Sequence, residues 1–169
     1  IYGYTKNQEK AWEIIEKLGL CSEQECKVQF TMADRKINAV MSTSAGRLFD
    51  AVSAILGIRR QSSFEGEAST ALQFAAEEFE QKGKLNGNEI WDNVQPVILG
   101  LEGRCILNTE ALVKQIVEAK LQGTDSGELA YLFHQTLAEQ VVAACIEARK
   151  SSGRNKTALS GGVFQNRLL

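Results

Sequence analysis

The feature that most constrains this chain is a stripe of apolar residues at helical spacing, which recurs in segment after segment. Its longest run extends from about Gly127 to Arg149. A period near 3.6 residues is typical of an amphipathic helix packed against a core. Thr124, Asp125 and Ser126 supply oxygen atoms that suit the beginning of this helix. The residues of its expected buried stripe are Leu129, Leu132, Phe133, Thr136, Leu137, Val141, Ala144 and Cys145.

Four shorter segments carry the same period and are predicted to be helices. Gly19 and Gly57 follow the first two of them, as is common just past a helix end. The four predicted helices span residues 7–18, 45–56, 67–81 and 108–121. Short strands are predicted over residues 90–99, 104–107 and 156–160, with loops over residues 59–64 and 82–88, while residues 27–35 fit neither period. The fold class is therefore α+β, mostly helical, with a small sheet toward the C-terminal side.

Composition excludes several classes of protein. Of the 169 residues, 44% are hydrophobic and 24% are charged, and the net charge is −2. These values exclude a disordered or collagen-like chain, and no basic surplus exists for binding nucleic acid. The apolar run Pro96–Leu99 falls far short of the ~18 residues that span a bilayer, and the N-terminus lacks the pattern of a signal peptide. We expect a cytoplasmic protein with no membrane or nucleic-acid partner, and we interpret a sequence that starts at Ile1 and stops at Leu169 as a piece of a longer protein.

The cysteines and the lone histidine point to structural roles. Cys21 and Cys26 form one close pair, but a zinc finger needs four convergent ligands. Cys105 and Cys145 lie in apolar patterns, where a free cysteine behaves as a small core residue. All four cysteines are predicted to be reduced. His134, the only histidine, lies on the longest predicted helix and is interpreted as a packed or capping residue rather than a metal ligand or a general base.

The strongest local signal for chemistry is the segment Ser160-Gly161-Gly162-Val163-Phe164-Gln165-Asn166, which we predict to connect a strand to a helix. Two glycines let backbone N–H groups approach an anion with no Cβ in the way, and a helix N-terminus adds unpaired N–H groups and a favourable dipole. The Asn166 amide is placed to reach a ribose or phosphate oxygen. A plain tight turn is the alternative. The segment matches neither the Walker loop nor the dinucleotide-binding fingerprint.

Two other segments are candidate parts of the same site. Ser42, Thr43 and Ser44 precede a helix, so their hydroxyls either cap it or donate to a ligand, while Arg47 and Asp50 are spaced to pair with each other. Farther along, Glu65 and Glu67 flank Gly66 before a second helix. These two carboxylates complement the helix dipole. The functional alternative is that Gly66 allows close approach of a nucleoside while Glu67 accepts a hydrogen bond from a ribose hydroxyl.

Four segments in order resemble one family, the HypF-type hydrogenase-maturation carbamoyltransferases, over residues 37–169. They read Thr43-Ser44-Ala45-Gly46-Arg47-Leu48-Phe49-Asp50-Ala51-Val52, Phe64-Glu65-Gly66-Glu67-Ala68, Phe133-His134-Gln135-Thr136-Leu137-Ala138 and Leu159-Ser160-Gly161-Gly162-Val163-Phe164-Gln165-Asn166-Arg167-Leu168-Leu169. The resemblance implies part of an actin-like ATPase (ASKHA) domain over residues 37–169, preceded by an N-terminal helical segment over residues 1–36.

The resemblance also implies an activity. The complete enzymes make carbamoyl-adenylate from carbamoyl phosphate and ATP, and then transfer the carbamoyl group to the C-terminal cysteine of a HypE-type acceptor protein. That group becomes a cyanide ligand of the nickel–iron hydrogenase centre. We weigh two alternatives: a relative of the tRNA threonylcarbamoyl transferases, against which the net charge of −2 argues, and a non-catalytic helical interaction module that uses the glycines only as a turn.

Carried over by resemblance, Gly66 and Asn166 match nucleotide-contacting positions of the sibling tRNA-modifying family, and Gly161 and Gly162 match its phosphate-side loop. Thr43 replaces an acidic residue of that family and Arg47 a glutamate, which favours the hydrogenase-maturation branch. The predicted nucleotide-binding residues are Thr43, Ser44, Gly46, Gly66, Glu67, Gly161, Gly162, Val163 and Asn166. The family's divalent-metal ligands, a His-x-x-x-His motif and an Asp, have no counterpart here, so we expect the isolated chain to be nearly inactive and assign no catalytic residue.

Overall fold

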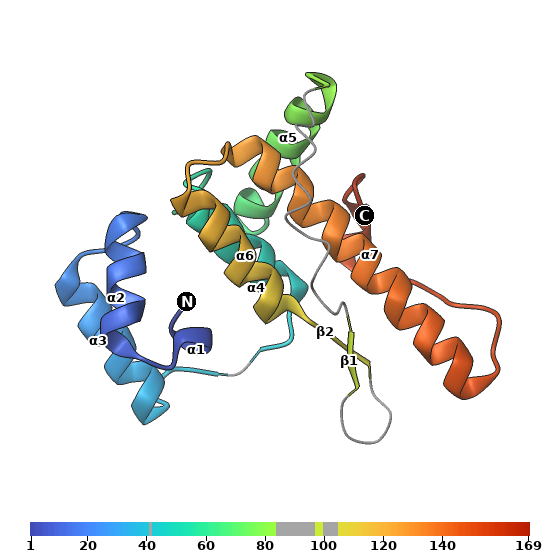
Figure 1. The fold of residues 1–169 in the computed structure, drawn as a ribbon, viewed down its shortest axis with the longest axis horizontal. Coiled ribbons are helices and arrows are strands. Elements are labelled where there is room, and N and C mark those ends of the chain that lie inside the picture. Colours follow the sequence, from blue (N-terminus) through green and yellow to red (C-terminus); the bar gives the residue numbers. More distant parts are fainter. Residues whose placement is uncertain (41, 84–96, 100–104) are drawn as a thin grey trace.

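The computed structural model describes residues 1–40, 42–83, 97–99 and 105–169, and it is mostly helical (Figure 1). Its elements are, in order, α1 (Tyr2–Thr5), α2 (Gln8–Lys17), α3 (Glu23–Arg35), α4 (Ala45–Ile55), α5 (Glu67–Gln81), β1 (Val97–Leu99), β2 (Cys105–Leu107), α6 (Thr109–Leu121), α7 (Ser126–Ser152) and the short 3-10 helix η2 (Gly162–Gln165). The helices predicted over residues 7–18, 45–56, 67–81, 108–121 and 127–149 are confirmed. Within the described residues, no helix is long and apolar enough to cross a membrane.

The main core forms where α7 packs against α5 and α6, with α4 packed against α5 (Figure 1). The rings of Phe49 on α4 and Phe133 on α7 meet edge to face, with centroids 4.9 Å apart. Leu72 of α5 and Leu112 of α6 are fully buried in the same cluster. Each buried side chain of this size contributes about 1.5–3 kcal/mol to folding. The apolar stripe of α7 therefore organises the fold, as its length in the sequence predicts.

Helices α1 to α3 form a smaller cluster beside this core. Its buried residues are Ala11, Cys26 and Phe30, and the ring of Phe30 contacts that of Tyr2 with centroids 4.7 Å apart. Arg60, from the loop after α4, ties this cluster to the core: its guanidinium donates to the Gly19 carbonyl and, at 2.8 Å, to the carbonyl of Leu18. The predicted division between residues 1–36 and 37–169 stays a prediction.

Helix α3 fills the segment that the apolar period alone does not assign. Ser22 and Glu25 form a capping box, in which the Ser22 hydroxyl accepts from the Glu25 amide and the Glu25 carboxylate accepts from the Ser22 amide. Cys26 and Phe30, four residues apart, are both buried. The apolar–polar alternation of Val28, Gln29 and Phe30 made this helical spacing difficult to recognise in the sequence. Val28 is 54% exposed and takes no part in the cluster, so it does not belong to the buried face of the helix.

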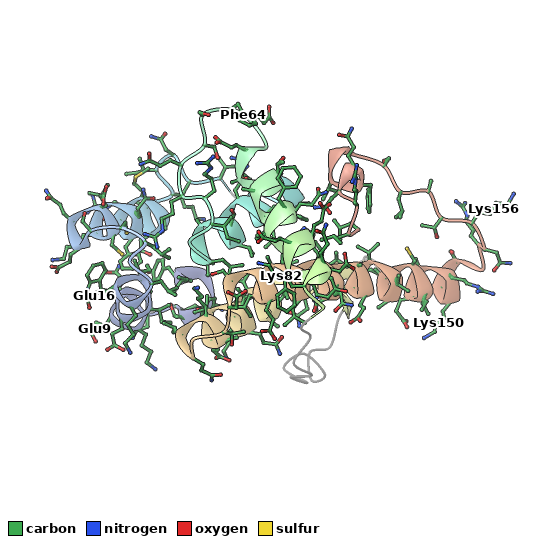
Figure 2. The ribbon with its side chains drawn as sticks, turned by 90° about the horizontal axis from the view of Figure 1, so that it is seen from above. Glu9, Glu16, Phe64, Lys82, Lys150 and Lys156 are labelled. Carbon is green, nitrogen blue, oxygen red and sulfur yellow. The ribbon has the colours of Figure 1, made fainter. Side chains whose placement is uncertain are left out.

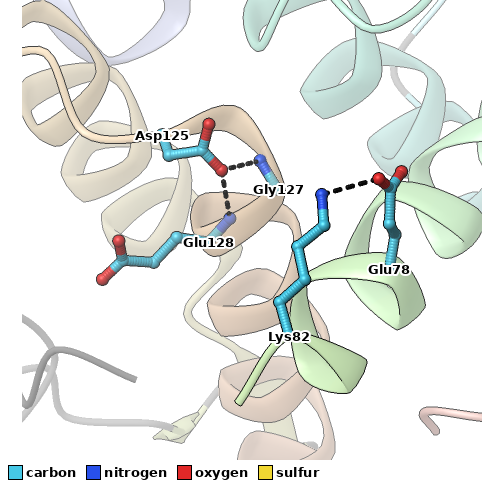
Figure 3. Close-up of polar contacts among 5 residues, drawn as sticks. All are labelled: Glu78, Lys82, Asp125, Gly127 and Glu128. Carbon is cyan, nitrogen blue, oxygen red and sulfur yellow. Dashed lines mark hydrogen bonds and ion pairs between the residues drawn. The ribbon is translucent and has the colours of Figure 1, made fainter. Parts of the chain in front are cut away.

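The junction of α5 and α7 depends on a glycine (Figure 3). Asp125 caps α7 by accepting from the amides of Gly127 at 2.9 Å and Glu128 at 3.2 Å. A Cβ added at Gly127 would lie 3.2 Å from the backbone oxygen of Ala75 on α5 and 3.4 Å from the Cβ of Phe79. The two helices are thus in close backbone contact, as the alanine-rich face of α5 favours.

Within the described residues, the sheet consists of two antiparallel strands, in which Ile98 lies opposite Ile106. The strand predicted over residues 104–107 is confirmed over Cys105–Leu107. Of the strand predicted over residues 90–99, only the part over Val97–Leu99 falls within the described residues, where it is confirmed. Residues 90–96 and most of the loop predicted over residues 82–88 lie outside the described residues.

The segment after α7 differs from its prediction. Beyond Gly153, the chain turns back, and its last residues lie alongside α7 (Figure 1 and Figure 2). Residues 156–160 form no strand, because no described strand pairs with them. No α-helix opens after Asn166: its backbone is extended, and its side-chain oxygen accepts from the Leu168 amide at 3.0 Å. A local turn of this kind competes with the helical hydrogen bonds.

Candidate functional site

One hollow brings together three segments that the sequence singles out separately. It has a volume of about 600 Å³, which suits a small-molecule site. Its wall is formed by the beginning of α4, the loop and first turns that open α5, and the segment around η2. The residues that line it are Gly46, Phe49, Glu65, Gly66, Ser69, Thr70, Gln73, Gly162, Val163, Gln165 and Asn166.

The glycine doublet forms a turn with uncommitted amides. Gly161 has a φ of 107°, a conformation that favours glycine, and η2 follows directly. Within η2 and its flanks, the Phe164 amide donates to the Gly161 carbonyl and the Asn166 amide to the Val163 carbonyl, each at 3.2 Å. Within the described residues, the amides of Gly161, Gly162 and Val163 donate no hydrogen bond to the protein. Of these three residues, Gly162 and Val163 line the hollow, so their amides are available to an acceptor there.

Two helices begin at the hollow without a side-chain cap. Ser44 stands at the N-cap of α4, but its hydroxyl makes no capping bond, and the Ser42 hydroxyl instead accepts from the Ser44 amide at 3.1 Å. Gly66 stands at the N-cap of α5 with a φ of 84° and has no side chain to offer. The unpaired amides and dipoles at two helix N-termini favour a negative charge nearby. The hydroxyl cap suggested for residues 42–44 is thus not formed by Ser44.

The first turns of α5 supply a polar wall that the sequence analysis did not single out. Ser69, Thr70 and Gln73 follow Gly66 by three, four and seven residues, which places all of them on one face of the helix. The Ser69 hydroxyl donates to the Gly66 carbonyl at 2.9 Å. This same spacing in the sequence was the available signal, because polar residues recur there at helical period opposite the alanine face. Phe49, Glu65 and Gln165 also line the hollow but were not among the predicted nucleotide-binding residues, although Glu65 and Gln165 lie in segments that the sequence analysis singled out.

The two carboxylates beside Gly66 have different surroundings. Glu65 lines the hollow and is the only charged residue among the described residues that line it. Glu67 is not among the lining residues and forms an ion pair with Arg59. The Ser63 amide donates to the Glu67 carboxylate at 2.6 Å, and this hydrogen bond, with the Ser63 hydroxyl and Arg59, lowers the pKa of Glu67. Glu67 therefore stabilises the loop that leads into α5, through its contacts with Ser63 and Arg59. The predicted ribose contact at Glu67 stays a prediction.

A buried histidine stands behind the glycine turn. His134 is fully buried on α7, and its Nδ1 lies 2.7 Å from the Ala130 carbonyl oxygen. Its Nε2 lies 2.9 Å from the Nδ2 of Asn166, which is 32 residues away in the sequence. Burial lowers the pKa of His134. The expectation of a packed histidine agrees with this burial, but the link to Asn166 was not foreseen.

The structure gathers most, but not all, of the predicted site residues. Gly46, Gly66, Gly162, Val163 and Asn166 line the hollow. The four others are not part of its lining: Thr43, Ser44, Glu67 and Gly161. Nucleotide binding by any of the nine residues stays a prediction. The predicted ion pair between Arg47 and Asp50 is formed at 2.9 Å.

The described residues do not provide a metal site. They contain no group of three or more histidine, cysteine, aspartate or glutamate side chains arranged around one point. Both ring nitrogens of His134 are already engaged. The four cysteines are free, and burial raises the pKa of the Cys26 thiol.

Comparison with known families identifies the class to which this fold and hollow belong. The family described as "Carbamoyltransferase, Kae1-like Domain, second subdomain" matches residues 2–169. The domain is therefore of the Kae1-like carbamoyltransferase class, within the actin-like ATPase (ASKHA) fold, and the predicted fold class is confirmed.

Individual relatives carry the assignment further. The chain is 29% identical over 161 residues to the probable carbamoyltransferase HypF of Methanocaldococcus jannaschii, covering 95% of this chain and 19% of that protein. It is 30% identical over 149 residues to the carbamoyltransferase HypF homolog of Cupriavidus necator, covering 87% of this chain and 36% of that protein. A crystal structure of full-length HypF in the phosphate- and nucleotide-bound form superposes with a TM-score of 0.73 and 28% identity, covering 91% of this chain and 22% of that one. The chain belongs to the HypF carbamoyltransferase family and spans about a fifth to a third of the length of these relatives.

Proposed function

We propose that this chain supplies the nucleotide-binding wall of a HypF-type carbamoyltransferase. The observation that carries the proposal is the convergence of Gly46, Gly66 and Gly162, from three distant parts of the sequence, on one hollow with unpaired amides around it. The nucleotide- and phosphate-bound form of the similar HypF structure supports the same assignment.

The electrostatics of the hollow suit a phosphate held by backbone groups. Among the parts of the chain that the structure describes, no lysine or arginine lines the hollow, so positive potential there comes from main-chain amides and from the N-termini of α4 and α5. The amides of Gly162 and Val163 donate to phosphate oxygens. The hydroxyls of Ser69 and Thr70 and the amide of Gln73 offer donors and acceptors for the ribose.

The chemistry proposed for the complete enzyme is the formation of carbamoyl-adenylate from ATP and carbamoyl phosphate. The carbamoyl group is then transferred to a C-terminal cysteine of a HypE-type acceptor protein, in the synthesis of the cyanide ligand of a nickel–iron hydrogenase. The contribution of this chain is to fix the adenylate in one orientation and to exclude water on one side of it, which lowers the entropic part of the barrier. A divalent metal held by ligands outside this chain, and a cytoplasmic location, belong to the same proposal.

The test compares two glycines that tolerate a side chain equally well. An added Cβ at Gly162 or at Gly3 meets no atom within 4 Å, and neither residue has the positive φ seen at Gly161. We expect Gly162→Val, in the complete polypeptide that contains residues 1–169, to weaken ATP binding at least tenfold in calorimetry, because its side chain occupies the approach to the amides. Gly3→Val, on α1, should bind like the wild type. Equal affinities in the two variants would contradict the proposal.

A further inference from the structure

The Asn166 side chain is held in one orientation by two partners of opposite kind. Its Oδ1 accepts from the backbone amide of Leu168 at 3.0 Å, and its Nδ2 lies 2.9 Å from Nε2 of His134. Because Leu168 supplies a donor, the oxygen and nitrogen of this amide cannot be exchanged without losing a hydrogen bond. The Nδ2 group must therefore donate to His134.

The same network fixes the protonation state of the imidazole. The Ala130 carbonyl, 2.7 Å from Nδ1, can only accept, so Nδ1 carries the proton. Nε2 must then offer its lone pair to Asn166, which requires a neutral ring. Burial favours this state by lowering the pKa of His134, and the carboxylate of Glu77 on α5 opposes the shift. Both observations agree on a neutral imidazole with its hydrogen on Nδ1.

This hydrogen bond connects the rigid core to the glycine turn. His134 is fully buried on α7, and its ring contacts that of Phe49 at a centroid distance of 5.4 Å. Because Phe49 lines the hollow, His134 lies directly beneath a lining residue. Val163, Leu168 and Leu169 also pack against the core. Those contacts are apolar and non-directional, whereas the bond from Asn166 sets an orientation.

We propose that His134 is a positioning residue of the nucleotide hollow: it holds Asn166 and thereby fixes the amides of Gly162 and Val163 at the hollow. This inference rests on the proposed function for what the amides bind, but not for the positioning itself. The second N–H of the Asn166 amide has no partner within the described residues and remains available to the bound nucleotide.

Two substitutions separate the two hydrogen bonds of the imidazole. In His134→Gln, the side-chain oxygen takes the place of Nε2, so the acceptor for Asn166 is kept. In His134→Asn, the shorter amide keeps the donor to the Ala130 carbonyl but does not reach Asn166. Both variants are polar, uncharged at every pH and made at one buried position, so each controls for the other.

The first readout is hydrogen exchange of the Phe164 and Asn166 amides, which bond within the turn, in the complete polypeptide without nucleotide. We expect His134→Asn to speed their exchange by roughly tenfold, the effect of losing one buried hydrogen bond, and His134→Gln to remain near the wild-type rate. Amides in the middle of α5 should exchange alike in both. Equal exchange of the turn in His134→Asn and the wild type would overturn the proposal.

The second readout is ATP affinity. Here, the dissociation constant should rise by about tenfold in His134→Asn and be rescued in His134→Gln. If the wild type binds no ATP, the proposed function fails, while the exchange contrast still decides the positioning role. If neither variant folds, nitrogen NMR of the wild-type imidazole decides it: an unprotonated Nε2 supports the proposal, and a proton on Nε2 overturns it.

Discussion

Gly66 allows a test in which backbone strain and side-chain clash are separated. It holds the N-cap of α5 at a φ of 84° and a ψ of 0°, and an added Cβ would lie 3.8 Å from the Ser69 hydroxyl oxygen, an ordinary contact. Gly66→Ala therefore introduces no clash, and its cost is the left-handed conformation, about 1–2 kcal/mol of unfolding free energy. Gly66→Asn adds a larger side chain, but asparagine visits this conformation with little strain, so its cost should stay below about 0.5 kcal/mol.

Thermal and urea unfolding of the chain, followed by circular dichroism, measure these costs. For a domain of this size, the alanine variant should melt roughly 2–8 °C below the wild type, and the asparagine variant within about 2 °C of it. ATP binding should be weakened in both, because each places a Cβ at the wall of the hollow. Equal melting temperatures for Gly66→Ala and Gly66→Asn would refute the strain argument, and a larger loss for asparagine would show that the limit is space rather than backbone conformation.

Three further predictions concern the rest of the fold. Gly127→Ala should lower the free energy of unfolding by about 1–3 kcal/mol in urea, because the new methyl group lies too close to the backbone of α5. Gly46→Ala should raise it by about 0.5–1 kcal/mol, because its Cβ meets only the Ser44 hydroxyl at 3.6 Å and alanine suits a helix better than glycine does. A change of the same sign in both variants would contradict the packing described. Arg60→Ala should speed hydrogen exchange in α2 and α3 while leaving α5 and α7 unchanged, because the guanidinium donates to two carbonyls at the end of α2. Unchanged exchange in α2 would show that these two hydrogen bonds do not stabilise the N-terminal helices. The pKa of His134 is lowered in the folded state, so as pH falls the unfolded chain takes up a proton at a higher pH than the folded protein does. The free energy of unfolding should therefore fall as pH drops below about 6.5. His134→Gln should remove this part of the pH dependence, and an identical pH profile in the variant would contradict the prediction.

The helices could be predicted where the apolar period and the end signals agree. The helix over Glu67–Gln81 was predicted with its observed bounds, because Gly66 precedes a regular stripe that includes Leu72 and Ala76. At the end of the chain the prediction was wrong, because the local pattern there was not sufficient to decide the structure. A strand over residues 156–160 needs a partner strand, and whether one lies alongside is decided by tertiary structure and not by the segment itself.

The candidate site was predictable in its glycines and not in its connections. Gly46, Gly66 and Gly162 stand out in the sequence because each lies at or next to a predicted turn or helix start, where a missing side chain has a use. The bond between His134 and Asn166 joins residues 32 positions apart and depends on the chain turning back along α7. Glu67 is absent from the lining and pairs instead with Arg59, a partner that no local pattern specifies.

The most direct test of the central claim is a crystal structure of the complete polypeptide bound to a non-hydrolysable ATP analogue. The phosphates should lie within hydrogen-bonding distance of the amides of Gly162 and Val163, with the nucleoside against Gly66 and the polar face of α5. A nucleotide bound at full occupancy elsewhere, with this hollow filled only by solvent, would contradict the account.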